Sequence, residues 1–264
     1  QITKKTVLYL PDFTPFFFPG TGAFDNHGFE TLVGRELCKR AATIITNSQF
    51  SFRYLPLTPL EVESKKIRIF YLPNLTSPIF TNDFKLESEI ETISSLLNGR
   101  DFIFYPTQAR PNKNLPLLLR CFNEIKESHP KLCLVLTSTF EHDSFSSDCY
   151  ETLSHKADII FVKGVSDRTL EWLYSKASCM VFTSWLEGNF PPQVLEAVLN
   201  RCPVVASNIP LISEHVVDIH TFLLLAEPDN LKDFQIKVLK VLETRSEILQ
   251  RQEPLRDKIF LMHS

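Results

Sequence analysis

Short apolar segments alternate with longer stretches of helical spacing along most of the chain. The apolar segments are rich in Val, Ile, Leu and Phe, as buried strands are, and apolar residues three and four positions apart mark amphipathic helices between them. We expect strands at residues 5–10, 43–46, 67–72, 102–105, 131–137, 158–162, 179–183, 204–206 and 221–225. We expect helices at residues 28–42, 48–55, 114–128, 148–155, 167–175, 192–199, 230–242 and from 247 onward.

This alternation predicts an α/β fold with a Rossmann-like, doubly wound parallel sheet. Ligands of such sheets bind beyond the carboxyl ends of the strands. Here those ends are polar, as in Thr137-Ser138 and Thr183-Ser184. Residues 77–99 are more polar throughout and are expected to form a linker with one helix. A ligand crevice is therefore expected along the carboxyl edge of the sheet.

Two carboxylates, Glu187 and Glu196, bracket a turn that opens the helix at 192–199. A helix start presents unpaired backbone N–H groups, which favour an anion such as phosphate. Because a carboxylate before that start would repel phosphate, Glu187 is expected to face neutral hydroxyls. A ligand that carries both hydroxyls and phosphate is typically a sugar nucleotide. The alternative is that both carboxylates simply face solvent. Asn200 is expected to end this helix in the left-handed conformation.

A second polar cluster follows the strand at 102–105 and opens the next helix. Its two cations, Arg110 and Lys113, can hold a diphosphate with their side chains, while the helix start adds N–H donors. Cations are unfavourable for the dipole at a helix start, which favours a role in binding a ligand. The alternative is a solvated basic turn.

Composition narrows the function class. The chain has 264 residues, of which 44% are hydrophobic and 22% charged, an ordinary balance for a globular protein. A net charge of −3 gives no electrostatic reason to expect nucleic acid as a partner. The six cysteines form no C-x-x-C pair and are expected to be buried thiols in the cytoplasm, and no signal peptide or membrane-spanning segment is recognised. Only 7 residues are glycine, although phosphate loops normally use glycine for close backbone approach.

Three segments in order resemble the nucleotide-sugar half of retaining glycosyltransferases of the two-Rossmann-domain GT-B type, the family 4 or group 1 enzymes. They are the loop carrying Lys113, the turn at 163–167, and the segment from Glu187 to Glu196. The run at 203–210, with Glu214 beyond it, is also similar to that family. The resemblance covers residues 102–242 well and the segments at 44–55 and 67–74 more weakly.

The resemblance implies roles for particular residues. Lys113 and Arg110 would assist departure of the donor diphosphate, although Gln108 stands where the family has Arg. Glu187 would contact the donor sugar and stabilise charge at the anomeric carbon, and Glu196 would bind the ribose hydroxyls. The turn of Lys163, Gly164, Val165 and Ser166 would meet the base, and Gly188, Asn189, Phe190 and Pro191 would line the sugar. One extra residue separates the two carboxylates compared with the family, and we expect it to lie in the turn.

The same resemblance implies the domain organisation. Residues 1–80 would be a remnant of the N-terminal acceptor domain, residues 81–242 the complete nucleotide-sugar domain, and residues 243–264 a helix packing back toward the N-terminal part. An N-terminal segment of the functional protein would then be missing from this chain. Asp12, at the end of the first strand, is the acceptor-side candidate, with loop capping as its alternative role. The aromatic run at 16–18 is more simply explained by packing than by docking a lipid-linked acceptor.

These observations predict a retaining glycosyltransferase that moves a hexose from a nucleoside-diphosphate sugar to a hydroxyl acceptor. GDP-mannose is the first donor expected, and the acceptor is a glycan, a lipid-linked glycan or a protein hydroxyl. No cofactor is expected, and no metal, because no Asp-x-Asp clamp lies near these loops. The prediction places the protein in the cytoplasm and leaves peripheral contact with a membrane open. A non-catalytic nucleotide-sugar-binding or interaction module and a sugar-nucleotide epimerase are the alternatives.

Overall fold

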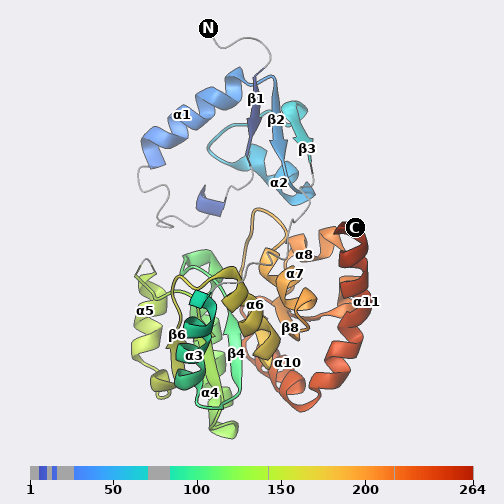
Figure 1. The fold of residues 1–264 in the computed structure, drawn as a ribbon. Helices are drawn as coiled ribbons and strands as arrows, with labels where there is room; N and C mark the ends of the chain where they lie inside the picture. The colour runs from blue at the N-terminus through green and yellow to red at the C-terminus, as the bar shows by residue number, and fades with distance from the viewer. Residues whose placement is uncertain are drawn as a thin grey trace. The chain divides into compact units, whose positions relative to one another are not determined.

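The computed structural model describes residues 6–10, 14–16, 27–70, 84–141, 143–216 and 218–263. Its contacts divide the chain into two units. The smaller unit contains residues 1–74, 186–191 and 209–217, and the larger unit contains residues 75–185, 192–208 and 218–264. Each unit has its own parallel sheet, blue in Figure 1 for the smaller unit and green to orange for the larger.

The larger unit is built on a six-stranded sheet with the order β6-β5-β4-β7-β8-β9. All of its neighbouring strands pair in parallel. The strands are β4 (Phe102–Tyr105), β5 (Cys133–Leu136), β6 (Ile159–Phe161), β7 (Cys179–Phe182), β8 (Val204–Ser207) and β9 (Leu224–Ala226). The order reverses direction between β4 and β7, so the loops that follow these two strands diverge and leave space for a ligand. The predicted doubly wound parallel sheet is confirmed.

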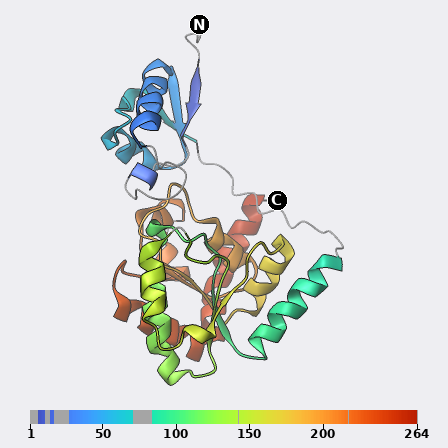
Figure 2. The same ribbon diagram turned by 90° about the vertical axis from the view of Figure 1, so that its left-hand side faces the viewer.

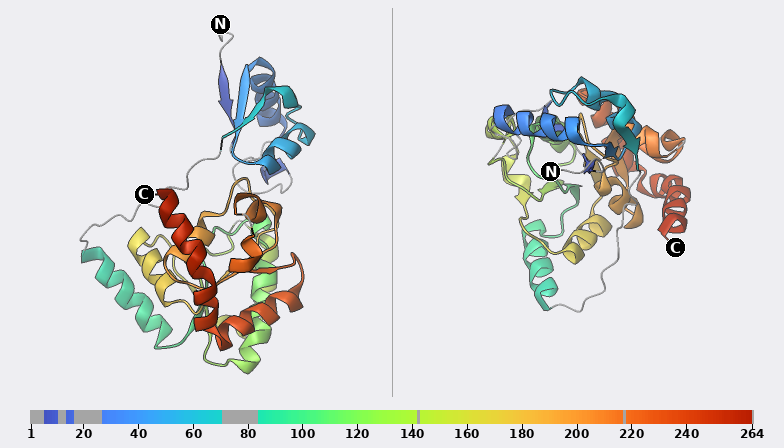
Figure 3. Two further views of the ribbon diagram at one scale, coloured as in Figure 1. Left: turned by 90° about the vertical axis from the view of Figure 1, so that its right-hand side faces the viewer. Right: turned by 90° about the horizontal axis from the view of Figure 1, so that it is seen from above.

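Helices cover both faces of this sheet. On one side α4 packs against α5 and α10, and on the other α3 packs against α6, α6 against α7, and α7 against α11. Figure 2 shows α3 and α6 on the opposite side of the sheet from α4 and α5, and α11 is dark red in Figure 3. The helices are α3 (Phe84–Leu97), α4 (Leu115–Ser128), α5 (Ser144–Glu151), α6 (Asp167–Lys176), α7 (Pro192–Leu199), α9 (Ile219–Phe222), α10 (Leu231–Glu243) and α11 (Arg245–His263). Because both faces are covered, the central strands β4, β5, β7 and β8 are buried throughout.

The smaller unit has a three-stranded parallel sheet with the order β1-β2-β3. Register places Leu8 opposite Ile44 and Ile44 opposite Ile67, so these three side chains share one face of the sheet. That face is packed into a core with Cys38 and Leu55. The elements of this unit are β1 (Val7–Tyr9), β2 (Thr43–Thr46), β3 (Ile67–Ile69), α1 (His27–Arg40), α2 (Gln49–Tyr54) and α8 (Pro210–His215).

Single-turn 3₁₀ helices lie in the connections. They span Thr14–Phe16, Leu55–Leu57, Ser64–Lys66, Pro111–Lys113 and Lys156–Asp158. The segment at Pro111–Lys113 matters for the site, because it lies between β4 and α4.

Several helix boundaries differ from the sequence prediction. The helix expected at 148–155 begins earlier, at Ser144, because Asp143 caps it by accepting the backbone N–H of Ser146. The strand expected at 221–225 is wrong in its first half, since Ile219–Phe222 is helical and the strand begins at Leu224. Burial of Ile219 holds that short helix in place against its weak local signal.

The expected left-handed cap at Asn200 is also wrong. Arg201 takes the positive φ of 55°, and the N–H of Cys202 bonds the carbonyl of Ala197 at 2.8 Å. This is the Schellman pattern, in which the residue after the cap is left-handed. The Asn200 side chain instead donates to the carbonyl of Glu196 at 2.9 Å.

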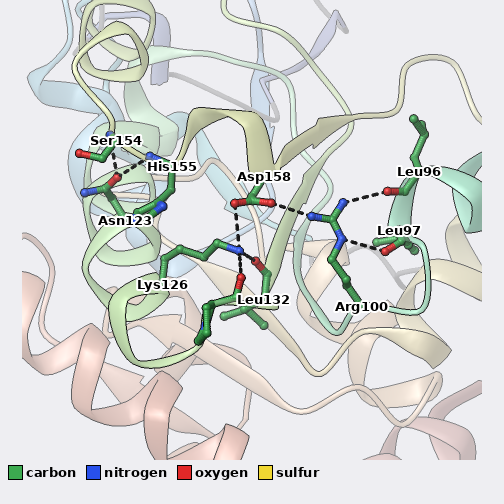
Figure 4. A network of polar contacts seen from close by, with 10 residues as sticks. Leu96, Leu97, Arg100, Asn123, Lys126, Leu132, Ser154, His155 and Asp158 are labelled. Carbon is green, nitrogen blue, oxygen red and sulfur yellow. Dashed lines mark hydrogen bonds and ion pairs between the residues drawn. The ribbon is translucent and has the colours of Figure 1, made fainter.

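A polar network lies before the amino ends of β4 and β6, at the edge of the sheet opposite its carboxyl ends (Figure 4). Arg100 donates to Asp158 at 2.6 Å, and Lys126 contacts the same carboxylate at 3.0 Å. Lys126 is only 3% exposed and also donates to the carbonyl of Leu132 at 2.7 Å. The network therefore ties α4 to the starts of two strands and pairs a buried cation.

Candidate functional site

A pocket of about 400 Å³ lies at the carboxyl ends of the strands of the larger unit. It is formed by the loops that follow β4, β5 and β6, together with α6 and the first turn of α7. Its lining residues are Pro106, Thr107, Gln108, Arg110, Lys113, Thr137, Gly164, Val165, Leu170, Pro192, Gln193 and Glu196. The pocket is therefore where the strand order predicts a ligand crevice.

The loop after β4 is fixed by the end of β5. The Thr137 hydroxyl accepts from the N–H of Thr107 at 2.8 Å and donates to the carbonyl of the same residue at 3.0 Å. The Ser138 hydroxyl accepts from the N–H of Ala109 at 3.4 Å. The polar residues that close β5 thus hold the stretch leading to Arg110, because they satisfy backbone groups that the sheet no longer pairs.

The segment with Lys113 is fixed by the end of β7. The hydroxyl of Thr183 donates to the carbonyl of Lys113 at 2.8 Å, and the N–H of Trp185 donates to the carbonyl of Asn112 at 2.9 Å. Asn114 then turns the chain into α4 with a positive φ of 50°. Asn tolerates that conformation better than most residues with a side chain. Two cations, Arg110 and Lys113, therefore line the pocket from a loop that is held on both sides.

Glu196 is the carboxylate of the pocket. It shares one face of α7 with Pro192 and Gln193, since residues three and four apart are neighbours on a helix. Its Oε2 accepts from the Tyr174 hydroxyl at 2.8 Å. Burial raises the pKa of Glu196, the hydrogen bond from Tyr174 acts in the opposite direction, and the carboxylates of Asp167 and Glu171 raise it further. Among the charged lining residues, two cations thus share the pocket with one carboxylate, which suits an anionic ligand that also carries hydroxyls.

The turn after β6 contributes backbone to the pocket. Gly164 has a φ of 62°, a conformation that a side chain would strain, and Gly164 and Val165 line the pocket. Ser166 instead caps α6, accepting from the N–H of Thr169 and donating to Glu89 at 2.9 Å. The side chain of Lys163 pairs with exposed Glu141 at 2.5 Å. Neither Lys163 nor Ser166 is a lining residue.

The segment from Glu187 to Pro191 groups with the smaller unit. Within that unit, the carbonyl of Gly188 accepts from the Ser51 hydroxyl at 3.3 Å, and Asn189 accepts from the N–H of Phe190 at 2.8 Å. Phe190 is only 2% exposed. The sugar-binding roles expected for Glu187, Gly188, Asn189, Phe190 and Pro191 stay predictions.

Other candidates fall outside what the structure describes. Asp12 lies outside the described residues, as do Phe17 and Phe18 of the aromatic run. Phe16 ends a 3₁₀ turn and packs against the core of the smaller unit.

The structure adds pocket residues that the sequence did not single out. Gln193 and Leu170 line the pocket. Tyr174 is not a lining residue, but its hydroxyl donates a hydrogen bond to the lining residue Glu196. A signal existed for Gln193, which precedes Glu196 by three positions on a helix. No comparable sequence signal marks Tyr174, because its partner is on another helix.

Two observations concern metal binding and membrane spanning. Among the described residues, no three or more His, Cys, Asp or Glu side chains gather as a metal site would require. Nor does any helix in the described part of the chain combine the length and apolarity needed to span a membrane. The predictions of metal-independent chemistry and of cofactor independence stay predictions.

The six cysteines are free, and burial raises the pKa of Cys121 and of Cys202 to about 12.

Comparison with known proteins adds a family match. A model of the family described as glycosyl transferases group 1 matches residues 87–256, which is more than half of the chain. The O-antigen chain mannosyltransferase RfbU of Salmonella typhimurium is 22% identical over 241 residues, which cover 91% of this chain and 62% of that protein.

Solved GT-B structures share the fold. Anabaena HepE in complex with UDP-glucose superposes with a TM-score of 0.71 at 16% identity, covering 97% of this chain and 67% of that chain. HepE with UDP and glucose gives 0.70, with 66% of that chain covered. A variant of S. aureus TarM, solved with fondaparinux, alpha-GlcNAc-glycerol and UDP, gives 0.66 at 14% identity, covering 98% of this chain and 48% of that chain. The chain therefore spans less than two thirds of the length of RfbU and about half of TarM.

Proposed function

Since this chain belongs to the glycosyl transferases group 1 family, we propose that its pocket binds the nucleoside diphosphate of a sugar donor. We propose further that the whole protein is a retaining, metal-independent glycosyltransferase that moves a hexose to a hydroxyl acceptor. The observation that carries the proposal is the pair of cations, Arg110 and Lys113, on a loop held by the residues that follow β5 and β7, in the same pocket as the carboxylate of Glu196. A diphosphate satisfies the two cations, and ribose hydroxyls satisfy the carboxylate.

The proposed chemistry follows from these charges. The bond between the anomeric carbon and the phosphate oxygen breaks, and a bond to the acceptor oxygen forms on the same face. The acceptor proton leaves with the departing diphosphate. Arg110 and Lys113 stabilise the negative charge that develops on that leaving group, and positioned cations of this kind stabilise a transition state strongly. Glu187 is proposed to contact the donor sugar and stabilise positive charge at the anomeric carbon.

GDP-mannose is the donor we propose first. The name of RfbU, a mannosyltransferase, supports mannose as the sugar. The HepE structures hold UDP and glucose, so UDP-glucose is the donor to compare with it. The acceptor is proposed to be a glycan, a lipid-linked glycan or a protein hydroxyl, reached in the cytoplasm and with peripheral membrane contact as an option.

Calorimetric titration of the chain with GDP, UDP, GDP-mannose and UDP-glucose tests the proposal. We expect at least one of them to bind, and Arg110→Ala and Lys113→Ala each to weaken that binding about tenfold or more, since each removes a charge-assisted contact. Lys131→Ala is the matched control, because Lys131 is exposed and precedes β5 at the other edge of the sheet. Absence of binding to all four compounds, or equal binding by the three variants and the wild type, would contradict the proposal.

A non-catalytic nucleotide-sugar-binding module is the second candidate. It is favoured by Gln108, which lines the pocket where the resemblance expects an arginine. Donor turnover by the full-length protein separates the two. Transfer with retention of anomeric configuration, followed by NMR and unaffected by a metal chelator, supports the enzyme; tight binding without any turnover supports the module.

A further inference from the structure

We propose that Tyr174 is a positioning residue that holds the carboxylate of Glu196 in the orientation in which it accepts hydroxyls of the bound nucleotide. The inference rests on the proposed function, because it requires a ligand with hydroxyls in this pocket. It adds a residue from a second helix, α6, to a site whose other polar side chains come from α7 and the strand-end loops.

The contact between the two side chains is direct. The hydroxyl of Tyr174 donates to Oε2 of Glu196 at 2.8 Å. A tyrosine hydroxyl has one proton to donate, and here that proton is committed to one oxygen of a carboxylate that lines the pocket. Since one oxygen is engaged from behind, rotation of the carboxylate is restricted and the remaining acceptor sites keep a fixed direction.

Tyr174 itself is rigidly held. It is only 1% exposed, and its ring packs edge-on against Phe104 of β4 with 5.1 Å between ring centroids. Burial, and secondarily the charge of Glu196, raises the pKa of the Tyr174 hydroxyl well above its usual value. The hydroxyl therefore stays protonated at neutral pH and remains a donor to Glu196. A donor fixed by the sheet thus orients an acceptor on a helix, which is how a positioning residue acts.

The hydrogen bond from Tyr174 also affects the protonation state of Glu196, because the other surroundings of this carboxylate favour the protonated form. Burial raises its pKa, the bond from Tyr174 lowers it, and Asp167 and Glu171 of α6 raise it further. Arg110 and Lys113 line the same pocket from the loop after β4.

Helix α7 also packs against β8, a strand without charged residues, and against α11, two of whose charged side chains reach the C-terminal end of α7. There Arg256 donates to the carbonyl of Leu199, and Glu253 pairs with Arg201. On α6, the Tyr174 hydroxyl thus favours the ionised form of Glu196, whereas the carboxylates of Asp167 and Glu171 on the same helix favour its protonated form.

The consequence for binding has a defined sign. Ionised Glu196 can accept hydrogen bonds from hydroxyl groups with both of its oxygens, whereas the protonated form has fewer acceptor sites. Nucleotide affinity should therefore fall as pH drops through the pKa of Glu196. Removing the Tyr174 hydroxyl removes the contribution that lowers this pKa, so the fall should begin at higher pH.

The test is calorimetric titration of GDP and UDP between pH 5 and pH 8 with the wild type, Tyr174→Phe and the control Tyr150→Phe. Tyr150 lies on α5 and makes ring contacts with Phe140 and Phe161, which phenylalanine keeps. We expect Tyr174→Phe to weaken binding about tenfold at neutral pH, because Glu196 loses the contact that fixes its orientation and supporting contacts of this kind typically contribute a factor of that size, and to move the midpoint of the pH profile upward. Tyr150→Phe should match the wild type.

Two further measurements separate positioning from a loss of structure. Carboxyl carbon NMR of Glu196 without ligand should titrate at higher pH in Tyr174→Phe than in the wild type. In a Glu196→Gln background, Tyr174→Phe should weaken binding much less than it does alone, because the ionised partner is gone. An unchanged Glu196 titration, or an equal effect of Tyr174→Phe in both backgrounds, would overturn the inference while leaving nucleotide binding intact. Failure of the wild type to bind either nucleotide at any pH would instead overturn the proposed function, and this inference with it.

Discussion

At the scale of single residues, this chain makes tight turns with few glycines. It has 7 glycines in 264 residues, and among the described residues six others adopt a positive φ: Glu61, Asn98, Asn114, Arg201, Asp218 and Asp229. Asn and Asp tolerate this conformation because their short side chains can bond locally, whereas Arg gains no such compensation. Arg201, which follows the C-terminal end of α7, and Glu61 are therefore the positions where a positive φ is least favourable.

Replacing Arg201 by glycine should stabilise the protein. The left-handed conformation costs a residue with a Cβ about 1 kcal/mol, and glycine avoids that cost. The ion pair of Arg201 with Glu253 joins side chains that are 63% and 39% exposed, so its loss should cost little. We expect the free energy of unfolding to rise by about 0.5–1 kcal/mol, measured by urea denaturation.

Arg201→Ala is the matched control, because it removes the same ion pair and keeps the strained backbone. It should be no more stable than the wild type. Equal stability of the glycine and alanine variants would show that the backbone strain at this position is negligible.

At the scale of elements, α2 of the smaller unit depends on a carboxylate from far along the chain. Glu214 of α8 accepts the N–H of Gln49 at 2.5 Å and that of Phe50 at 2.9 Å, and the Ser48 hydroxyl accepts that of Ser51 at 2.9 Å. A negative charge at a helix start also stabilises the helix dipole. Ser48 has a residue type that commonly caps helices and stands at the start of the expected helix, whereas the contribution of Glu214 has no local signal, because 165 residues separate it from Gln49.

Removing the Glu214 carboxylate should loosen α2. With Glu214→Ala, two backbone donors lose their acceptor, at a cost of about 1–2 kcal/mol by analogy with other caps. We expect amide hydrogen exchange at Gln49 and Phe50 to become about tenfold faster or more. Glu91→Ala, a change at an exposed position of α3, should leave both amides unaffected. Unchanged protection of both amides in Glu214→Ala would refute this role.

At the scale of the larger unit, a stabilising polar network and the pocket lie at opposite edges of one sheet. The network of Arg100, Lys126 and Asp158 lies before the amino ends of the strands, and the pocket lies at their carboxyl ends. Lys126 is the most buried cation of the network, and breaking its pair leaves an uncompensated charge.

Asp158→Asn should therefore destabilise the larger unit without altering the pocket. We expect a loss of about 3 kcal/mol in the free energy of unfolding, at the low end for a broken buried pair because Lys126 keeps carbonyl partners. Nucleotide affinity below the unfolding transition should stay as in the wild type. Asp101→Asn, at an exposed neighbouring position, is the control and should change neither quantity. A change in affinity comparable to the change in stability would show that the two edges are coupled.

Much of the larger unit was predictable because its signals are local. Strands such as Phe102–Tyr105 and Val204–Ser207 are apolar runs that only a covered parallel sheet buries on both faces. The same holds for Arg110 and Lys113, because a loop that follows a buried strand must lie at the carboxyl edge. The domain boundaries expected at residues 80 and 242 stay predictions.

The sequence by itself determined the α/β class, the parallel sheet, the family and the edge at which Arg110, Lys113 and Glu196 meet. These follow from periodicity and motif order, which depend on neighbours along the chain. Only the tertiary structure decided that Arg201 takes the left-handed turn, that Lys163 and Ser166 are engaged away from the pocket, and that Tyr174 holds Glu196. The contacts of Lys163, Ser166 and Tyr174 depend on partners from other elements, which packing selects through burial and hydrogen-bond satisfaction rather than through sequence spacing, and the turn at Arg201 depends on the residue at which α7 ends.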